Sequence, residues 1–177
     1  CAGILAHHRG LPVEHFIAAC NVNDVVPEYL RTEILKPKET VATISNAMDV
    51  GDPSNFVRIL ELFEKEFNQV KSKLSGYTID DEETLKTIER VEKDYGYVLD
   101  PHGAVAFVAL EKYLTENDGK GFFLETAHPV KFPDSVEQAT GKSVEIPKSL
   151  EELMKQEKFT TEINPQYEEL KEFLLKK

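Results

Sequence analysis

The sequence predicts an α/β fold in which a mostly parallel sheet is flanked by helices. Short apolar or β-branched runs alternate along the chain with segments whose apolar residues recur at helical spacing. Of the 177 residues, 41% are hydrophobic and 30% are charged, which is the balance of a folded globular protein. A chain of this length can bury one core. We therefore expect helices to cover both faces of the sheet.

The charge distribution argues against a nucleic-acid partner. The net charge is −11, and the lysines and arginines are spread among acidic neighbours, whereas phosphate contacts need clustered cations. No apolar run approaches the roughly 18 residues of a membrane span, and no signal peptide is recognisable. Cys1 and Cys20 are too few for a disulfide framework and lack metal-ligand spacing. We expect a cytoplasmic protein without a membrane partner or a metal site.

The first predicted element is a helix over residues 1–9, which ends at Gly10 before Pro12. Its first residues include no Ser, Thr or Asp that could cap it. A helix without its cap predicts that further chain precedes Cys1 in the complete protein.

Four short segments are predicted as strands, because they are apolar or β-branched and are bounded by turn residues. They are residues 15–20, 40–44, 97–99 and 122–125.

The helices are predicted from apolar stripes and from end signals. The longest begins near Pro53 and ends at Gly76, and its stripe consists of Phe56, Leu60, Phe63, Phe67, Val70 and Leu74. A second runs from a cap at Asp80 or Asp81 to Gly96. Further helices are predicted over residues 25–31, 104–114, 133–139, 150–155 and 166–176. The chain is thus expected to divide into an α/β core over about residues 1–145 and a helical segment over about residues 146–177.

Functional residues are expected in the loops after the strands, because ligands of parallel sheets lie outside the carboxyl ends of strands. The loop over residues 45–55 is the richest in polar side chains, and the helix start at Pro53 offers an anion site. Taken alone, each feature favours a structural interpretation: a capped helix start here, a polar turn at Asn21, a cap at His102 and a strand end at Thr126. The residues by themselves indicate an α/β domain able to hold a small anion, and they name no reaction.

Several strings together resemble the threonine synthase family, in the family's order and at about its spacing. The most specific is Ser-Asn-Ala-Met-Asp-Val-Gly-Asp-Pro-Ser-Asn-Phe at residues 45–56. The others are residues 10–13, 16–19, 21–27, 100–106 and 126–132. The resemblance covers residues 1 to about 150. It implies the C-terminal part of a fold-type-II pyridoxal-phosphate enzyme.

The resemblance implies conversion of O-phospho-L-homoserine and water to L-threonine and phosphate, with the cofactor as electron sink. The lysine that forms the internal aldimine and the loop that binds the cofactor phosphate lie upstream in this family. No lysine of this chain matches the aldimine position. We therefore expect no catalytic residue in this part and no activity from it alone.

Among the residues present, the resemblance matches Thr126 to the hydroxyl residue that meets the pyridine nitrogen. Ser45, Asn46 and Asp49 are expected on the substrate side of the cleft. Asn21 and His102 are added from their strand-end positions. Two alternatives remain: a dehydratase of the same fold type, and a non-catalytic domain that binds small anions. We also expect self-association through the face that the missing part would cover.

Overall fold

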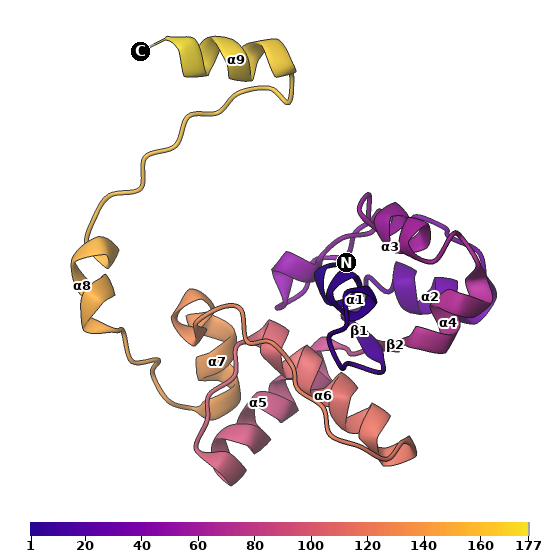
Figure 1. The fold of residues 1–177 in the computed structure, drawn as a ribbon. Coiled ribbons are helices and arrows are strands. Elements are labelled where there is room, and N and C mark those ends of the chain that lie inside the picture. The colour runs from indigo at the N-terminus through magenta and orange to yellow at the C-terminus, as the bar shows by residue number, and fades with distance from the viewer. Residues whose placement is uncertain (177) are drawn as a thin grey trace. The chain divides into compact units, whose positions relative to one another are not determined.

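The computed structural model describes residues 1–176 and falls into two compact units, Cys1–Val144 and Glu145–Lys177. The first unit contains a two-stranded parallel sheet surrounded by helices (Figure 1). This confirms the α/β class, with more helix and less sheet than the sequence predicts.

The elements of the first unit are α1 (Ala2–His8), β1 (Phe16–Cys20), α2 (Val25–Thr32), the 3-10 helix η1 (Asn46–Met48), α3 (Phe56–Leu62), α4 (Phe67–Lys73), β2 (Leu74–Thr78), α5 (Asp81–Tyr95), α6 (Pro101–Glu116), the 3-10 helix η2 (Pro129–Lys131) and α7 (Pro133–Thr140). The second unit contains α8 (Lys148–Met154) and α9 (Tyr167–Leu175).

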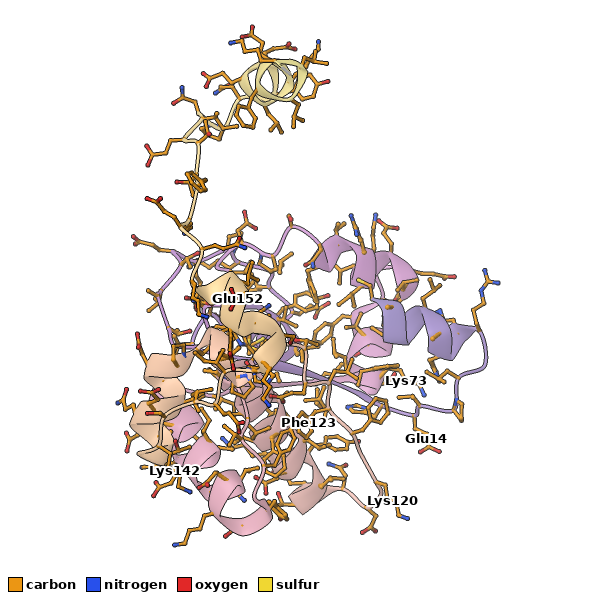
Figure 2. All side chains as sticks on the ribbon, turned by 90° about the vertical axis from the view of Figure 1, so that its left-hand side faces the viewer. Glu14, Lys73, Lys120, Phe123, Lys142 and Glu152 are labelled. Carbon is orange, nitrogen blue, oxygen red and sulfur yellow. The ribbon has the colours of Figure 1, made fainter. Side chains whose placement is uncertain are left out.

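The strands β1 and β2 pair in parallel, with Phe16 opposite Leu74 and Cys20 opposite Thr78. The predicted strand over residues 15–20 is confirmed as β1. Lys73 Nζ donates a hydrogen bond to the backbone carbonyl of Glu14 at 3.4 Å. This bond connects the segments that precede the two strands (Figure 2).

The prediction that Gly76 ends a helix is wrong, because Gly76 lies in the middle of β2. A Cβ at this position would stand 2.7 Å from the Cα of Pro27 in α2. Glycine is therefore required for the close approach of α2 to the sheet.

The long helix predicted from Pro53 to Gly76 is also wrong. It is divided into α3 and α4, and the break contains Glu64 at φ 54° and Lys65 at φ 62°. Neither residue is a glycine, so the sequence carries no signal for two consecutive left-handed residues. The predicted stripe nevertheless faces inward: Phe56, Phe63, Val70 and Leu74 are buried in one cluster with Ile4, Tyr29 and Leu30.

The segments over residues 40–44, 97–99 and 122–125 form no strand within the described residues 1–176, so these three predictions are wrong. For residues 40–44 the reason is visible. The side-chain amide of Asn23 donates to the carbonyl of Val41 and accepts from its N–H, both at 2.8 Å. A side chain thus takes the hydrogen bonds that a neighbouring strand would otherwise make.

The predicted helices α5, α6 and α7 are confirmed, and α5 packs against both of the others (Figure 1). Asp80 caps α5 by accepting from the N–H of Glu83, and Gly96 ends it in the left-handed conformation at φ 67°. The helix α6 begins at Pro101, one residue after its cap Asp100, and so contains His102 in its first turn.

The two helices predicted near the C-terminus are confirmed as α8 and α9. Phe173 and Leu174 on α9 are exposed by 48% and 62%, so its apolar face has no cover within the second unit. Across the part of the chain that the structure describes, no helix has the length and apolarity needed to cross a membrane.

Candidate functional site

A buried polar network lies at the carboxyl end of β1. Asn21 follows the last residue of that strand and is only 1% exposed. Its Nδ2 lies 2.8 Å from Asp49 Oδ1, 2.8 Å from Thr43 Oγ1 and 3.1 Å from Ser45 Oγ. An amide has two N–H groups, so these acceptors share them. One side chain at the strand end therefore holds the loop over residues 43–49.

Asp49 fixes the same loop from its other side. Its Oδ2 accepts from the backbone N–H of Thr43 at 2.9 Å, and its Oδ1 accepts from the Thr43 hydroxyl at 2.7 Å. The Asn21 Oδ1 in turn accepts from the backbone N–H of Asn23 at 2.9 Å, which makes the polar turn that the sequence favours. These bonds order a loop whose regular structure is limited to the 3-10 helix η1.

His102 supports the loop from α6. Its Nε2 accepts from the backbone N–H of Ala47 at 3.1 Å, and its Nδ1 lies 2.6 Å from Asp100 Oδ1. An acceptor Nε2 requires the proton to be on Nδ1, where it is donated to the carboxylate. Both ring nitrogens are therefore in use, and the ring is 8% exposed.

Asp100 is fully buried and is joined to Glu125. The N–H of Asp100 donates to Glu125 Oε1 at 2.9 Å. Burial, helped by the neighbouring Asp100 carboxyl and opposed by the hydrogen bond from the Asp100 N–H, raises the pKa of the Glu125 carboxyl to about 7. Glu125 is thus a carboxyl that holds its proton near neutral pH.

Thr126 follows Glu125 and is exposed. The segment before it is anchored by Phe123, whose ring meets that of Phe107 edge-on with centroids 5.6 Å apart (Figure 2). Phe122 and Leu124 are each 71% exposed, so alternate side chains point outward although the segment pairs with no strand among residues 1–176.

The structure brings together Asn21, Ser45 and Asp49, and it joins His102 to them through Ala47. Asn46 lies on η1 and is exposed, unlike Thr43, Ser45 and Asp49 in the same loop. Ser45 is fully buried and acts within the network. Asn23, Thr43 and Glu125 also belong to the site, but they were not predicted as site residues from the sequence. A polar residue two positions after Asn21 is a signal for Asn23, whereas nothing local to residue 125 predicts contact with Asp100.

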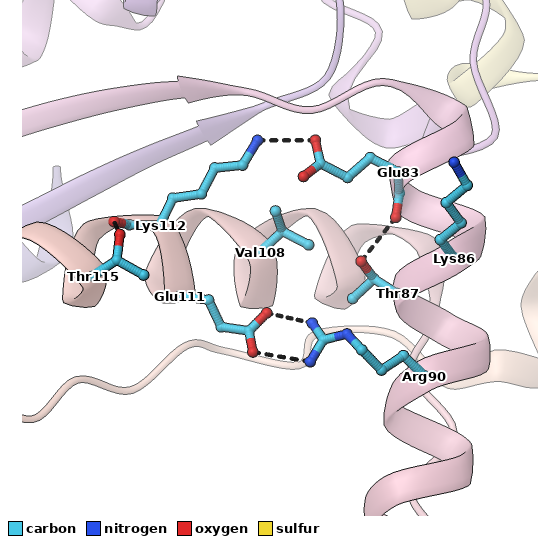
Figure 3. A pocket seen from close by; sticks show the side chains of 8 residues that line it. All are labelled: Glu83, Lys86, Thr87, Arg90, Val108, Glu111, Lys112 and Thr115. Atoms are coloured by element: carbon cyan, nitrogen blue, oxygen red, sulfur yellow. Dashed lines mark hydrogen bonds and ion pairs between the residues drawn. The ribbon is translucent and has the colours of Figure 1, made fainter.

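Two other features carry no chemistry. Burial, followed by the charge of Asp24, raises the pKa of the Cys20 thiol to about 12, so this thiol is no nucleophile. A groove between α5 and α6 is lined by the ion pairs Arg90–Glu111 and Lys112–Glu83 (Figure 3). Each cation there already faces a carboxylate, so the groove offers no unpaired charge to a ligand.

Comparison with known proteins identifies the relatives of this chain. The family model "Threonine synthase, C-terminal" matches residues 103–174. The threonine synthase of Escherichia coli (strain K12) is 49% identical over 152 residues, which are 85% of this chain and 35% of that protein. The threonine synthase of Buchnera aphidicola subsp. Schizaphis graminum is 43% identical over 178 residues, covering 99% of this chain and 40% of that protein.

Solved structures agree with the sequence comparison. The threonine synthase of Escherichia coli matches 98% of this chain with a TM-score of 0.87 and 43% identity, over 40% of its own length. The PLP-bound threonine synthase of Brucella melitensis matches 98% of the chain with a TM-score of 0.80 and 29% identity. The chain spans about two fifths of the length of these relatives. By sequence and by fold, the chain corresponds to the C-terminal part of threonine synthases.

Proposed function

We propose that this chain forms part of a pyridoxal-phosphate-dependent lyase that converts O-phospho-L-homoserine and water to L-threonine and phosphate. The observation that carries the proposal is the likeness to the threonine synthase of Escherichia coli, at a TM-score of 0.87 over 98% of the chain. The threonine synthase of Brucella melitensis has been solved with PLP bound. The reaction and the cofactor are carried over from these relatives as proposals.

The residues present fit the cofactor ring. Thr126 is exposed, and a hydroxyl can hydrogen-bond a pyridine nitrogen. Because a hydroxyl is neutral, it leaves that nitrogen unprotonated more often than a carboxylate would. When bound, pyridoxal phosphate would supply an electron sink for the electron pairs left behind when protons leave the substrate carbons.

The loop over residues 45–49 is proposed to hold the substrate. Asn46 presents its amide to solvent, and an amide can donate to a carboxylate or a phosphate. Asn21, Ser45 and Asp49 keep this loop rigid through the buried bonds described above. We assign these three residues to positioning the loop and Asn46 to substrate contact.

We further propose that the chain alone is inactive, because none of its lysines matches the family's cofactor-binding lysine. A first test mixes the purified chain with pyridoxal phosphate. We expect no absorbance from lysine-bound cofactor. A band that borohydride reduces, and that maps to a lysine of this chain, would contradict the proposal.

Activity is tested in a chimera in which this chain replaces the aligned part of the Escherichia coli enzyme, to which it is 49% identical over 152 residues. We expect phosphate and threonine to form from O-phospho-L-homoserine. Thr126→Val should reduce the rate, whereas Thr115→Val, an exposed threonine on α6, should not. A folded chimera that binds the cofactor but acts only on threonine or serine would support the dehydratase instead. One that binds small anions without any turnover would support the non-catalytic domain.

We also propose a domain division, a mode of self-association and a cellular location for this chain. We propose that about residues 1–145 form the α/β core of the catalytic fold and that about residues 146–177 are a separate helical segment. Self-association is proposed through exposed apolar side chains such as Phe122 and Leu124, each 71% exposed. No nucleic-acid or membrane partner is proposed. A cytoplasmic location is supported by the two cysteines, which are both free thiols.

A further inference from the structure

We propose that Asp100 and Glu125 form a proton-sharing carboxyl pair. The pair holds Thr126 in place relative to the loop over residues 45–49, and His102 is the link between the two. The inference rests on the proposed function only in the role given to Thr126, because the pair itself is a property of this chain.

A continuous run of hydrogen bonds joins the two parts of the proposed site. It begins at the N–H of Ala47, which donates to His102 Nε2 at 3.1 Å. It continues from His102 Nδ1 to Asp100 Oδ1 at 2.6 Å, and from the N–H of Asp100 to Glu125 Oε1 at 2.9 Å. Thr126 is the next residue along the chain. A displacement of either carboxyl therefore reaches both the loop and Thr126.

One oxygen of each carboxyl lacks a partner. Asp100 Oδ2 and Glu125 Oε2 are both buried and make no hydrogen bond in the described part of the chain. The Asp100 carboxyl is a neighbour of the Glu125 side chain that, after burial, contributes to the raised pKa of Glu125. A single proton between the two oxygens would satisfy both of them, whereas two buried negative charges side by side would repel.

The proton is assigned to Glu125. Asp100 Oδ1 already accepts from the N–H and from the Nδ1 of His102, whereas no donor faces Glu125 Oε2 among the described residues. The raised pKa of Glu125, at about 7, agrees with this assignment. The titratable groups that face the pair are His102 on α6 and Tyr97 in the segment before α6, whose own pKa is raised by burial and by both carboxylates.

Gly103 makes room for the pair. A Cβ at this position would lie 1.8 Å from Glu125 Oε2. The overlapping atom is the end of a flexible side chain, so Gly103→Ala should turn the Glu125 carboxyl away without breaking the helix. This variant separates the two carboxyls while leaving both in the protein.

The test follows the Glu125 carboxyl carbon by NMR in the 177-residue chain as the pH is raised. We expect a midpoint near 7 in the wild-type chain. In Asp100→Asn and in Gly103→Ala the midpoint should fall toward the ordinary value of a glutamate, by less in Asp100→Asn because the burial of Glu125 remains there. Glu116→Gln, an exposed position at the other end of α6, should leave it unchanged. The His102 ring signal is recorded in the same samples as a control, so that a change at His102 is not mistaken for a change at the carboxyl pair.

The positioning role is tested by the amide signals of Ala47 and Thr126. In the wild-type chain both should shift with the midpoint of the pair. In Glu125→Gln they should stay near their low-pH positions at every pH, because the Gln amide can donate to Asp100 Oδ2 as the shared proton does. Glu125→Ala should move both signals at every pH. Titration of wild-type Glu125 near 4.5, or a shift of Ala47 in Glu125→Gln as large as in Glu125→Ala, would overturn the proposal.

A spectroscopic comparison in the chimera separates this inference from the proposed function. Thr126→Val should change the absorbance of bound pyridoxal phosphate, and Glu125→Gln should remove its pH dependence near 7. If the NMR results hold but Thr126→Val leaves the absorbance unchanged, the cofactor role of Thr126 is overturned and the carboxyl pair stands. If Thr126→Val changes the absorbance but Glu125→Gln leaves its pH dependence intact, the positioning role is overturned and the proposed function stands.

Discussion

The backbone N–H of Ala47 donates to Nε2 of His102 at 3.1 Å, although the two residues are 55 positions apart in the sequence. The bond joins η1, in the loop over residues 45–49, to the first turn of α6. It also fixes the proton on Nδ1 of the ring. His102 therefore serves as a brace between two segments whose side chains define the candidate site.

Asn21→Ala should destabilise the chain by about 2–3 kcal/mol, because it removes the donor shared by three side chains of the network and leaves the buried N–H of Asn23 without its acceptor. The free energy of unfolding, measured by urea denaturation, checks this. Asn117→Ala removes an exposed side-chain bond to the carbonyl of Tyr113 and should cost well under half as much. Equal losses in the two variants would show that the network adds no stability.

Gly76→Ala should destabilise the chain by about 1–3 kcal/mol, since the new methyl group overlaps the backbone of Pro27 and α2 must move off the sheet. Thermal unfolding followed by circular dichroism measures the loss. Ser72→Ala, at an exposed position on the neighbouring α4, provides the comparison. A Gly76→Ala chain as stable as wild type would contradict the close packing of α2 on β2.

Asp80→Ala should cost about 1 kcal/mol of stability, because the side chain caps α5 by accepting from the N–H of Glu83. Asp80→Asn keeps an acceptor at this position and should retain most of that stability. Chemical denaturation of the three chains is sufficient to compare them. An Asn variant as weak as the Ala variant would indicate that the negative charge, and not the cap, stabilises the helix.

Stability should fall as the pH rises from about 4.5 to 7 through the contribution of Glu125. Its folded-state pKa, about 7, lies above its ordinary value of 4.5, so the folded chain holds a proton that the unfolded chain releases in this range. The contribution is fully present below 4.5 and is lost as the pH passes 7. After solvent screening we expect on the order of 1 kcal/mol. Glu125→Gln should remove this part of the pH dependence, which unfolding measured at several pH values detects.

Helix ends could be predicted from the sequence where a capping side chain or a left-handed glycine marks them. Asp80, Gly96 and Gly141 mark where helices begin or end, because caps and left-handed residues depend on chemistry within one turn. The apolar stripe from Phe56 to Leu74 correctly indicated which side chains are buried. It could not reveal the break at Glu64 and Lys65, since that break depends on packing and has no glycine or proline to announce it.

The failed strand predictions and the composition of the site depend on contacts between residues that are distant in sequence. Residues 40–44 are rich in β-branched side chains, yet Asn23 and Asp49 take backbone hydrogen bonds of this segment and it forms no strand. For the site, the strand-end argument selected Asn21, Ser45 and Asp49, which do meet. It could not select Glu125, because the burial and the neighbour that perturb this carboxyl exist only in the folded chain.

We propose that this chain, joined to the cofactor-binding part of a threonine synthase, takes part in elimination of phosphate and addition of water. The most direct test is the position of the label when the chimera turns over O-phospho-L-homoserine in water containing heavy oxygen. We predict that the label enters the side-chain hydroxyl of threonine and that the released phosphate is unlabelled, because the carbon–oxygen bond breaks and water adds at Cβ. Label in the phosphate, with homoserine as the other product, would contradict the account.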